Sequence, residues 1–424
     1  MAINPDLLLS QRANWAEGQP ISDLMARALA NPQLISLAAG FVDQQSLPAG
    51  ETRQALEALF TDPVETRRAL QYGTTPGYPP LREALLESTR AADGDALDNV
   101  TVDQLVLTAG SNQLLHLVVE CLLDPGDIVL CASPTYLVFL GTLNNLGARS
   151  VGVASDDDGL IPEALKETLA RLDAQGELER VKALYLVPYF DNPGGVTIPR
   201  QRREEIFEIV QRWSHKGRIR IIEDNAYRAL RYSGDDTPSM LGLDADGDTV
   251  IVAGTFSKSY SPGIRVGWGI LPRDLVTPVC NQKGNIDFGS PNFSQHLMAK
   301  VLQLGLYYPH IEMLRRTYRE KLAAMLAAAD ELLSPLPDVH WRRPRGGLYV
   351  WLHVPPHVDT GPSGRLFDAA IAEGMLYVPG QFCFPTEGEP AQRNAIRLSF
   401  GVQTPSGIRQ GIAALARAIR DVTQ

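Results

Sequence analysis

Short apolar runs alternate with amphipathic stretches through the middle of the chain, from about residue 51 to residue 290. Each run is bounded by Gly, Pro, Asp or Ser, and several are apolar at every position, which is typical of strands buried on both faces of a parallel sheet. Helical periodicity fills the intervals, for example at 111–123 and 200–213. This alternation predicts an open α/β sheet. The predicted strands are residues 105–108, 127–131, 181–187, 219–223, 249–253 and 266–271.

The pattern changes after about residue 292. A long helical stretch, residues 292–333, is followed by short apolar strands at 346–354 and 395–401, with helices between them. This order predicts a second, smaller α+β domain that is entered by a long helix. We therefore expect three parts: an N-terminal segment (1–50) that packs with the small domain, a large domain (51–291) and a small C-terminal domain (292–424).

Composition narrows the function classes. The 424 residues carry a formal net charge of −10, which argues against a nucleic-acid-binding surface. The four cysteines lie far apart, without a C-x-x-C pair or a histidine at metal-ligand spacing, so we expect neither a disulfide framework nor a metal. The N-terminus lacks the features of a signal peptide, and no apolar stretch reaches the ~20 residues that cross a bilayer. We expect a cytoplasmic protein with no membrane or nucleic-acid partner.

Polar residues at the strand ends are the candidates for chemistry, because open α/β sheets bind ligands beyond the carboxyl ends of their strands. Ser111 and Asn112 follow the first predicted strand and form either a plain helix cap or an anion cradle. Asn192 follows the third, either in an ordinary turn or as an amide that donates to a ring oxygen. Asp224 follows the fourth, as a helix cap or as an anion facing a protonated heterocyclic nitrogen.

The segment after the fifth predicted strand is the most informative. Lys258 lies just past an apolar run and among hydroxyl side chains. A lysine in such a site tends toward the neutral amine, which can form a Schiff base, and the alternative is an ordinary surface lysine. Thr255, Ser257 and Arg265 supply hydroxyl groups and a guanidinium, which suit a phosphate.

Eight segments, taken together, resemble one known family. They are ISLAAG (35–40), YGTTPGYPPLREAL (72–85), LTAGSNQ (107–113), SPTY (133–136), VPYFDNPGG (187–195), IIEDNAY (221–227), GTFSKSYSPGIRVGW (254–268) and IRLSFG (396–401). The chain resembles the fold-type I pyridoxal-phosphate enzymes of the aspartate aminotransferase superfamily, class I/II, and within it the branch of the kynurenine and 2-aminoadipate aminotransferases. The resemblance implies an α/β fold: a three-layer large domain with a mostly parallel, seven-stranded sheet, and a smaller α+β domain. It also implies pyridoxal 5′-phosphate as the cofactor.

The resemblance gives each candidate near the cofactor ring a role. Lys258 would form the internal aldimine and shuttle the proton of the 1,3-shift. Asp224 would pair with the pyridinium nitrogen, which keeps the ring an electron acceptor. Asn192 and Tyr227 would hydrogen-bond the phenolic oxygen of the ring, and Tyr136 would stack on its face.

The resemblance likewise implies how the phosphate and the substrate are held. Tyr72 would reach the phosphate of the neighbouring subunit, which requires a homodimer with shared active sites. Arg397 would clamp the α-carboxylate of the substrate, helped by Asn192 and the backbone at Gly40. The phosphate would be held within the subunit by Ser111, Asn112, Thr255, Ser257 and Arg265.

Two departures from the family pattern bear on the substrate. The usual Asn-Pro-Thr-Gly reads Asn-Pro-Gly-Gly at residues 192–195, and the missing threonine is expected to loosen that turn. Relatives that act on 2-aminoadipate carry an arginine in the helix corresponding to residues 21–29, and here Ser22 or Asp23 falls near its place. Recognition of a second carboxylate would need Arg12, Arg27 or another residue. An apolar pocket for the side chain is indicated by Leu24, Phe41 and Tyr136.

The leading function is an aminotransferase that exchanges an amino group between an α-amino acid and a 2-oxoacid by a ping-pong mechanism through Lys258. A lyase or decarboxylase with the same cofactor is the first alternative. A ligand-sensing regulator is a further one, although the ~35 residues before the first family segment are too few and too acidic for a DNA-binding domain. A dinucleotide-binding dehydrogenase is disfavoured because no G-x-G-x-x-G follows a predicted strand.

Overall fold

The computed structural model describes residues 9–16, 26, 31, 33–38 and 40–423. The α-helices are α1 (Gln11–Trp15), α3 (Ala49–Thr61), α4 (Pro63–Ala69), α5 (Pro79–Asp93), α6 (Ser111–Leu122), α7 (Leu137–Asn145), α8 (Pro162–Ala174), α9 (Arg200–Trp213), α10 (Arg273–Asp287), α11 (Asn292–Gln303), α12 (Tyr307–Leu332), α13 (Arg365–Ala372) and α14 (Pro405–Thr423). The strands are β1 (Ile35–Ser36), β2 (Leu105–Thr108), β3 (Ile128–Ser133), β4 (Arg149–Asp156), β5 (Gly159–Leu160), β6 (Val181–Leu186), β7 (Arg220–Asp224), β8 (Val250–Thr255), β9 (Gly267–Ile270), β10 (His340–Trp341), β11 (Tyr349–His353), β12 (Met375–Leu376), β13 (Val378–Pro379), β14 (Glu387–Gly388) and β15 (Ala395–Ser399).

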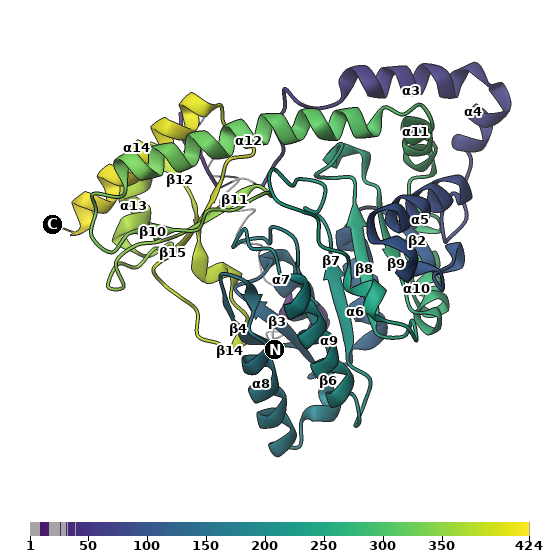
Figure 1. Cartoon of the computed structure of the whole chain (residues 1–424), viewed down its shortest axis with the longest axis horizontal. Helices are drawn as coiled ribbons and strands as arrows, with labels where there is room; N and C mark the ends of the chain where they lie inside the picture. The colour runs from purple at the N-terminus through teal and green to yellow at the C-terminus, as the bar shows by residue number, and fades with distance from the viewer. Residues whose placement is uncertain (1–8, 17–25, 27–30, 32, 39, 424) are drawn as a thin grey trace, which may run out of the picture.

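A mostly parallel sheet forms the centre of the molecule (Figure 1). Its strand order is β14-β4-β3-β6-β7-β8-β9-β2, with β5 paired to β4. Among its long strands only β9 runs antiparallel to its neighbours β8 and β2. The seven long strands confirm the expected sheet, which β14 and β5 extend by two residues each at one edge. Six of the seven were predicted from the apolar pattern; β4 was not.

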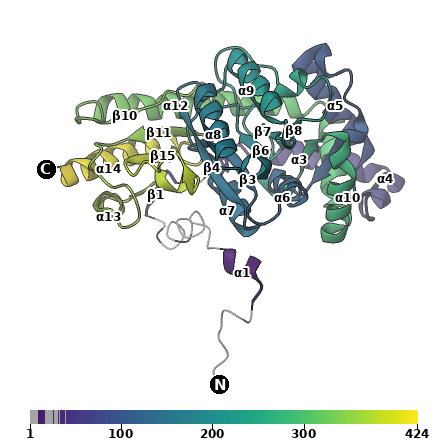
Figure 2. The same ribbon diagram turned by 90° about the horizontal axis from the view of Figure 1, so that it is seen from below.

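Five of the seven long strands have apolar side chains on both faces of the sheet, as the unbroken apolar runs predicted. The exceptions are β9, with Gly267 and Gly269 on one face, and β4, with Ser150 and Gly152 on one face. Successive residues alternate between two buried cores: Ile222 and Ile251 face one, and Ile221 and Val250 face the other. Figure 2 shows α8 and α9 on one side of the strands and α6 and α7 on the other. The result is the three-layer arrangement of an α/β protein, whose parallel strands are shielded from water on both faces.

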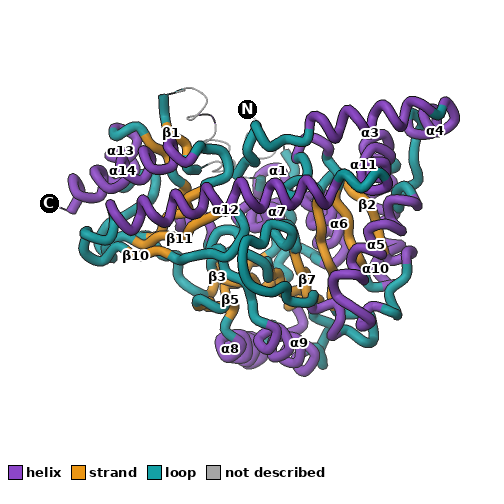
Figure 3. Tube along the Cα trace, turned by 45° about the horizontal axis from the view of Figure 1, so that its top comes forward, coloured by secondary structure: helices purple, strands orange, loops and turns teal. Residues whose placement is uncertain are grey.

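The C-terminal part contains a smaller antiparallel sheet of order β10-β11-β15-β13, whose buried side chains share one apolar core with those of α12, α13 and α14. In Figure 3 this sheet lies on the side of α13 and α14, apart from β2 and β7 of the large sheet. The expected single helix over 292–333 is two helices. Gly305 has a φ of 68° between α11 and α12, a conformation that ends a helix.

The N-terminal segment meets the C-terminal part where β1 pairs in parallel with β12. α12 runs along the top of Figure 1 from α11 toward α13 and α14, while α11 itself packs on α3 and α5. The proposed domain boundary at residues 291 and 292 stays a prediction. Within the described residues, no helix is both long enough and apolar enough to cross a membrane.

Candidate active site

A cavity of about 300 Å³ opens beyond the carboxyl ends of the large sheet, where the C-terminal part meets it. It is lined by every residue that the resemblance assigned to the cofactor, the α-carboxylate or catalysis, except Tyr72. The predicted residues that line it are Gly40, Ser111, Asn112, Tyr136, Asn192, Asp224, Tyr227, Thr255, Ser257, Lys258, Arg265 and Arg397.

One end of the cavity is built to receive an anion. The N-terminus of α6 begins at Ser111, directly after Gly110. Arg265 lies beside it in the left-handed region and donates from Nη2 to the carbonyl oxygen of Ala109 at 3.0 Å. A Cβ on Gly110 would lie 2.7 Å from Nη2 of Arg265, and one on Gly267 only 2.5 Å from the backbone nitrogen of Ser111. Both glycines are therefore needed for this close packing, which brings a helix N-terminus and a guanidinium together.

Two hydroxyl groups complete this end. Thr255 is the last residue of β8, and its hydroxyl donates to that of Ser257 at 3.0 Å. The backbone N–H of Ser257 donates to the Thr255 hydroxyl at 3.1 Å. These contacts hold a tight turn directly before Lys258, so the hydroxyl groups and the amine open into the same cavity.

Asp224 ends β7 as a buried carboxylate, 4% exposed. The hydroxyl of Tyr185 donates to Oδ2 at 2.9 Å, and the backbone N–H of Ala226 donates to Oδ1 at 3.1 Å. Burial raises the pKa of Asp224 to about 6, although these two hydrogen bonds and the positive charge of Lys258 act to lower it. A carboxylate held at such a desolvation cost is suited to a cationic partner in the cavity.

Lys258 reaches across the cavity to the N-terminal segment. Its Nζ donates to the carbonyl oxygen of Gly40 at 2.7 Å. Gly40 is itself tightly placed, because a Cβ there would lie 2.7 Å from the hydroxyl of Tyr349. The amine is thus held between the two parts of the chain, near the carboxylate of Asp224.

Arg397 lies on β15 and is 2% exposed. Its Nη1 donates to Oδ1 of Asn192 and its Nη2 to the carbonyl oxygen of Ala38, both at 2.9 Å. The guanidinium carbon lies 4.5 Å from the ring centroid of Tyr349. Nε is buried and has no partner among the described residues. A buried cation with a donor to spare is suited to an anionic ligand.

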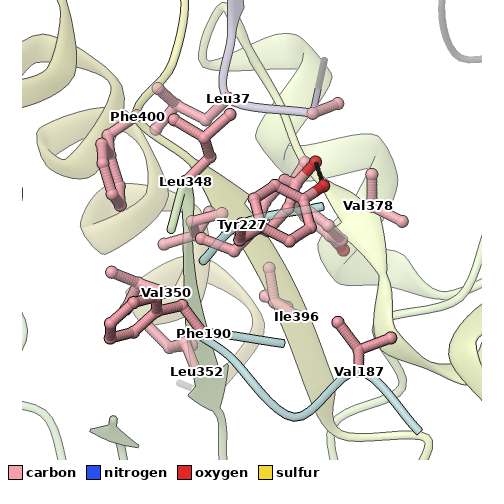
Figure 4. Close-up of a cluster of buried hydrophobic side chains, with 14 of the residues drawn as sticks. Leu37, Val187, Phe190, Tyr227, Leu348, Val350, Leu352, Val378, Ile396 and Phe400 are labelled. Atoms are coloured by element: carbon pink, nitrogen blue, oxygen red, sulfur yellow. Dashed lines mark hydrogen bonds between the residues drawn. The ribbon is translucent and has the colours of Figure 1, made fainter. Parts of the chain in front are cut away.

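Tyrosine side chains form the remaining walls. The hydroxyl groups of Tyr227 and Tyr349 lie 3.2 Å apart, and their rings meet edge to face. Figure 4 shows Tyr227 beside an apolar cluster that includes Leu348 just before β11, Val350 of β11 and Ile396 of β15, which fixes the ring position. The hydroxyl of Tyr136 donates to Oδ1 of Asn112 at 3.5 Å.

Sequence reasoning missed Tyr185 and Tyr349. Each lies inside a predicted strand, where a tyrosine is read as part of the core. A usable signal was available, because a phenol on a strand that is buried on both faces needs a polar partner. Tyr349 faces Ser399 across the β11–β15 pair, next to Arg397, which is paired with Trp351.

The residues expected to govern the substrate are only partly placed. Phe41 lines the cavity, while Arg12 lies in an exposed ion pair with Glu120 at 3.2 Å. Ser22, Asp23, Leu24 and Arg27 lie outside the described residues. Tyr72 is 80% exposed and does not line the cavity of its own chain.

The residues of the cavity fit a flat, phosphate-bearing ring cofactor. The glycine-dependent cradle at α6 suits a phosphate, Asp224 suits a protonated ring nitrogen, and Lys258 suits an aldehyde carbon. Arg397 with its free Nε remains for a carboxylate beyond the ring. Pyridoxal phosphate has these features and, when bound, supplies an electron sink for chemistry at an amino-acid Cα.

Comparison with known proteins gives the same class. Residues 32–415 match the family model described as aminotransferase class I and II. Aromatic-amino-acid aminotransferase 1 of Thermococcus litoralis is 33% identical over 417 residues, covering 97% of this chain and 94% of the relative. The 2-aminoadipate transaminase of Thermus thermophilus is 32% identical over 391 residues, covering 92% of this chain and 91% of the relative.

A solved structure agrees with these relatives. The kynurenine aminotransferase of Pyrococcus horikoshii, crystallised in complex with PMP, superposes with a TM-score of 0.89 at 31% identity, covering 99% of this chain and 98% of that one. Fold and site thus define a pyridoxal-phosphate-dependent transferase. The chain belongs to the class I and II aminotransferase family. The family and its named members support transamination over the lyase, decarboxylase and regulator alternatives.

Proposed function

We propose that this aminotransferase accepts an α-amino acid with an apolar or aromatic side chain and passes its amino group to a 2-oxoacid by a ping-pong mechanism. The observation that carries the proposal is the composition of the 300 Å³ cavity, which Lys258, Asp224 and Arg397 all line. Its remaining walls are largely apolar and include Phe41, Leu137, Val138 and Val187. The relatives named for aromatic amino acids and kynurenine support the same substrate class.

We assign the cofactor-facing roles by position. Lys258 would hold the cofactor covalently through Nζ and would carry a proton to and from the substrate Cα. Asp224 would hold the proton on the ring nitrogen, and its burial would strengthen that electrostatic interaction. Asn192 and Tyr227 would hydrogen-bond the phenolic oxygen of the ring, and Tyr136 would stack on its face.

The phosphate and the substrate carboxylate would be held by two different sets of residues in the cavity. Arg397 binds the carboxylate together with Asn192 and the backbone at Gly40, a role that its buried, unpartnered Nε supports. The phosphate is bound by Ser111, Asn112, Thr255, Ser257 and Arg265, which surround the N-terminus of α6.

We also infer a homodimer in which Tyr72 reaches the phosphate in the neighbouring subunit. Tyr72 rests edge to face on Phe288, with ring centroids 5.4 Å apart. Leu70, Ile286 and Phe288 on the same two segments are 65%, 55% and 61% exposed. An apolar patch of this kind marks an interaction surface more often than a free one. The protein is assigned to the cytoplasm on the strength of its four free cysteines.

The role of Lys258 can be tested by chemical labelling. Borohydride reduction of the yellow holoenzyme should fix the cofactor on the peptide that contains Lys258, as read by mass spectrometry. Lys258→Ala should abolish this labelling, whereas the exposed Lys166→Ala should leave it unchanged. Labelling of a different lysine would refute the assignment.

The substrate class is read from half-reactions without an oxoacid. The holoenzyme should convert its cofactor to pyridoxamine phosphate with phenylalanine or kynurenine at least about tenfold more efficiently than with 2-aminoadipate, since one carboxylate is matched by Arg397 and the second meets apolar walls. A preference for 2-aminoadipate would overturn the proposed class.

A further inference from the structure

The turn that carries Asn192 is fastened by the residue before it. The Asp191 carboxylate accepts the backbone N–H of Val196 at 2.5 Å through Oδ1 and that of Gly194 at 3.2 Å through Oδ2. Its carbonyl accepts the N–H of Gly195 at 2.8 Å, and its own N–H donates to the carbonyl of Val196 at 2.9 Å. Asp191 therefore closes the loop from both its side chain and its backbone, where the absence of threonine had predicted a looser turn.

Asp191 and Gly194 fit together as a pair. A Cβ on Gly194 would lie 3.0 and 3.1 Å from the two carboxylate oxygens of Asp191, and 2.6 Å from Nη1 of Arg342. The carboxylate and the guanidinium thus take the space that the threonine of the family's Asn-Pro-Thr-Gly pattern would enter. A threonine at position 194 would therefore force the guanidinium of Arg342 to move and would crowd the carboxylate of Asp191.

Arg342 supports this arrangement from the C-terminal part. It follows β10, donates from Nε to Oδ1 of Asp157 at 2.9 Å and donates from Nη2 to the carbonyl oxygen of Asp156 at 3.1 Å. Burial raises the pKa of Asp191, and the nearby charge of Arg342 opposes that rise. The turn is therefore held between the β4–β5 hairpin and the smaller sheet.

The consequence reaches the active site through Asn192, which is 2% exposed and accepts a hydrogen bond from Arg397 at 2.9 Å. Asp191 does not line the active-site cavity but a separate void of about 20 Å³ behind it. A shift of the turn by ~1 Å would break the hydrogen bond between Asn192 and Arg397, because such bonds weaken steeply beyond about 3.5 Å.

We propose that Asp191 is a positioning residue that takes the place of the family's turn threonine and aligns Asn192 with Arg397 and the cofactor ring. This inference rests on the proposed role of Arg397 as the carboxylate clamp. It deepens that function by naming the residue that sets the geometry of the clamp.

The test uses the holoenzyme and a readout independent of turnover. The dissociation constant of 3-phenylpropionate, a carboxylate without an amino group, is measured from the change that it causes in the absorbance of the cofactor. The second readout is the band pKa, which is the apparent pKa at which the visible absorbance band of the cofactor changes with pH. Asp191→Ala should raise the dissociation constant by about tenfold and shift the band pKa, with cofactor content unchanged. Asp191→Asn should fall between, because its amide oxygen can still accept the N–H of Val196. Asp158→Ala, an exposed change on the neighbouring hairpin, should match the parent.

Pairing the two positions gives the decisive comparison. Gly194→Thr alone should weaken 3-phenylpropionate binding, since its side chain would clash with Asp191 and Arg342. The double variant Asp191→Ala, Gly194→Thr should bind 3-phenylpropionate at least about tenfold more tightly than the two single losses combined would predict. The reason is that the threonine hydroxyl can then enter the space that Asp191 has vacated. Losses that simply add, or an Asp191→Ala enzyme that is less stable but has parental binding and band pKa, would overturn the proposal.

Failure of the proposed function would look different. A parent holoenzyme that converts no amino acid, or that binds 3-phenylpropionate equally well with Arg397→Ala, refutes the clamp itself. The shift of the band pKa in Asp191→Ala would still report whether the turn positions Asn192 against the ring.

Discussion

The buried carboxylate of Asp224 lowers the free energy of unfolding of the cofactor-free enzyme at pH values where it is ionised, and the size of this effect can be predicted. The group is 4% exposed, and burial raises its pKa to about 6 from an ordinary value of 3.8. The folded chain therefore binds this proton more tightly than the unfolded chain does. The stabilisation that this tighter proton binding gives the folded state is fully present below pH ~3.8 and is lost as the pH rises through ~6. The loss reaches about 3 kcal/mol at pH 8, at ~1.4 kcal/mol for each pKa unit.

Asp224→Asn should remove this loss, because the amide stays neutral at every pH and has the same shape. Its oxygen can accept the N–H of Ala226, and its NH₂ can donate to the hydroxyl of Tyr185, which replaces both present hydrogen bonds. We expect the cofactor-free variant to be more stable than the cofactor-free parent by about 1–3 kcal/mol at pH 8. Between pH 8 and pH 5 this advantage should shrink by about 1.4 kcal/mol, as the parent carboxylate takes up its proton.

Urea unfolding of the two cofactor-free proteins at pH values from 5 to 8 measures the difference directly. Asp158→Asn, an exposed carboxylate, serves as the control and should show a difference that does not vary with pH. Adding pyridoxal phosphate should reverse the order, because the ring cation stabilises the carboxylate only in the parent. A stability difference between parent and Asp224→Asn that is independent of pH, or that grows as the pH falls, would refute the reasoning.

Two further variants test the two ends of the cavity. Arg397→Ala should weaken the amino-acid half-reaction by about 2–5 kcal/mol, because the substrate carboxylate loses a buried charge partner. Arg397→Lys should recover only part of this loss, since a single ammonium cannot form a bidentate pair. A half-reaction whose dependence on amino-acid concentration is unchanged in Arg397→Ala would rule out the clamp. Gly267→Ala should lower the affinity for pyridoxal phosphate, because its methyl group would lie 2.5 Å from the backbone nitrogen of Ser111; Gly50→Ala, in open space on α3, is the matched control, and equal affinities in the two variants would contradict the packing argument.

The large sheet was largely predictable because its strands are buried on both faces and so appear as unbroken apolar runs. β4 escaped this criterion. It begins at Arg149 and Ser150, contains Gly152 and ends at the exposed Asp156, since it lies near the edge of the sheet beside two-residue strands. The break between α11 and α12 was also missed. Leu304 and Leu306 continue the apolar pattern across the interruption, and only Gly305 marks it.

The site was predictable where a polar side chain follows a strand, as at Asn192, Asp224 and Lys258. Parallel strands bring their carboxyl ends to one edge, so sequence position alone places these groups together. Tyr349 and Arg397 instead meet because β11 and β15 pair in one particular antiparallel register. A shift of one residue would turn Tyr349 to the other face, and the apolar pattern of β11 does not specify its partner strand.

The three residues that the sequence did not predict have one property in common, which is that each contacts or positions a site residue that the sequence did predict. Tyr185 donates to Asp224, Asp191 ties the turn beside Asn192, and Tyr349 lies against both Tyr227 and Arg397. A charge such as Arg397, at 2% exposure, is costly to hold away from water unless its hydrogen bonds are satisfied. Supporting side chains are thus required by the burial that makes the site effective, and their identity is set by whichever element packs nearby. The residues proposed to contact the cofactor and substrate follow from the chemistry, whereas those behind them follow from the packing of this particular chain.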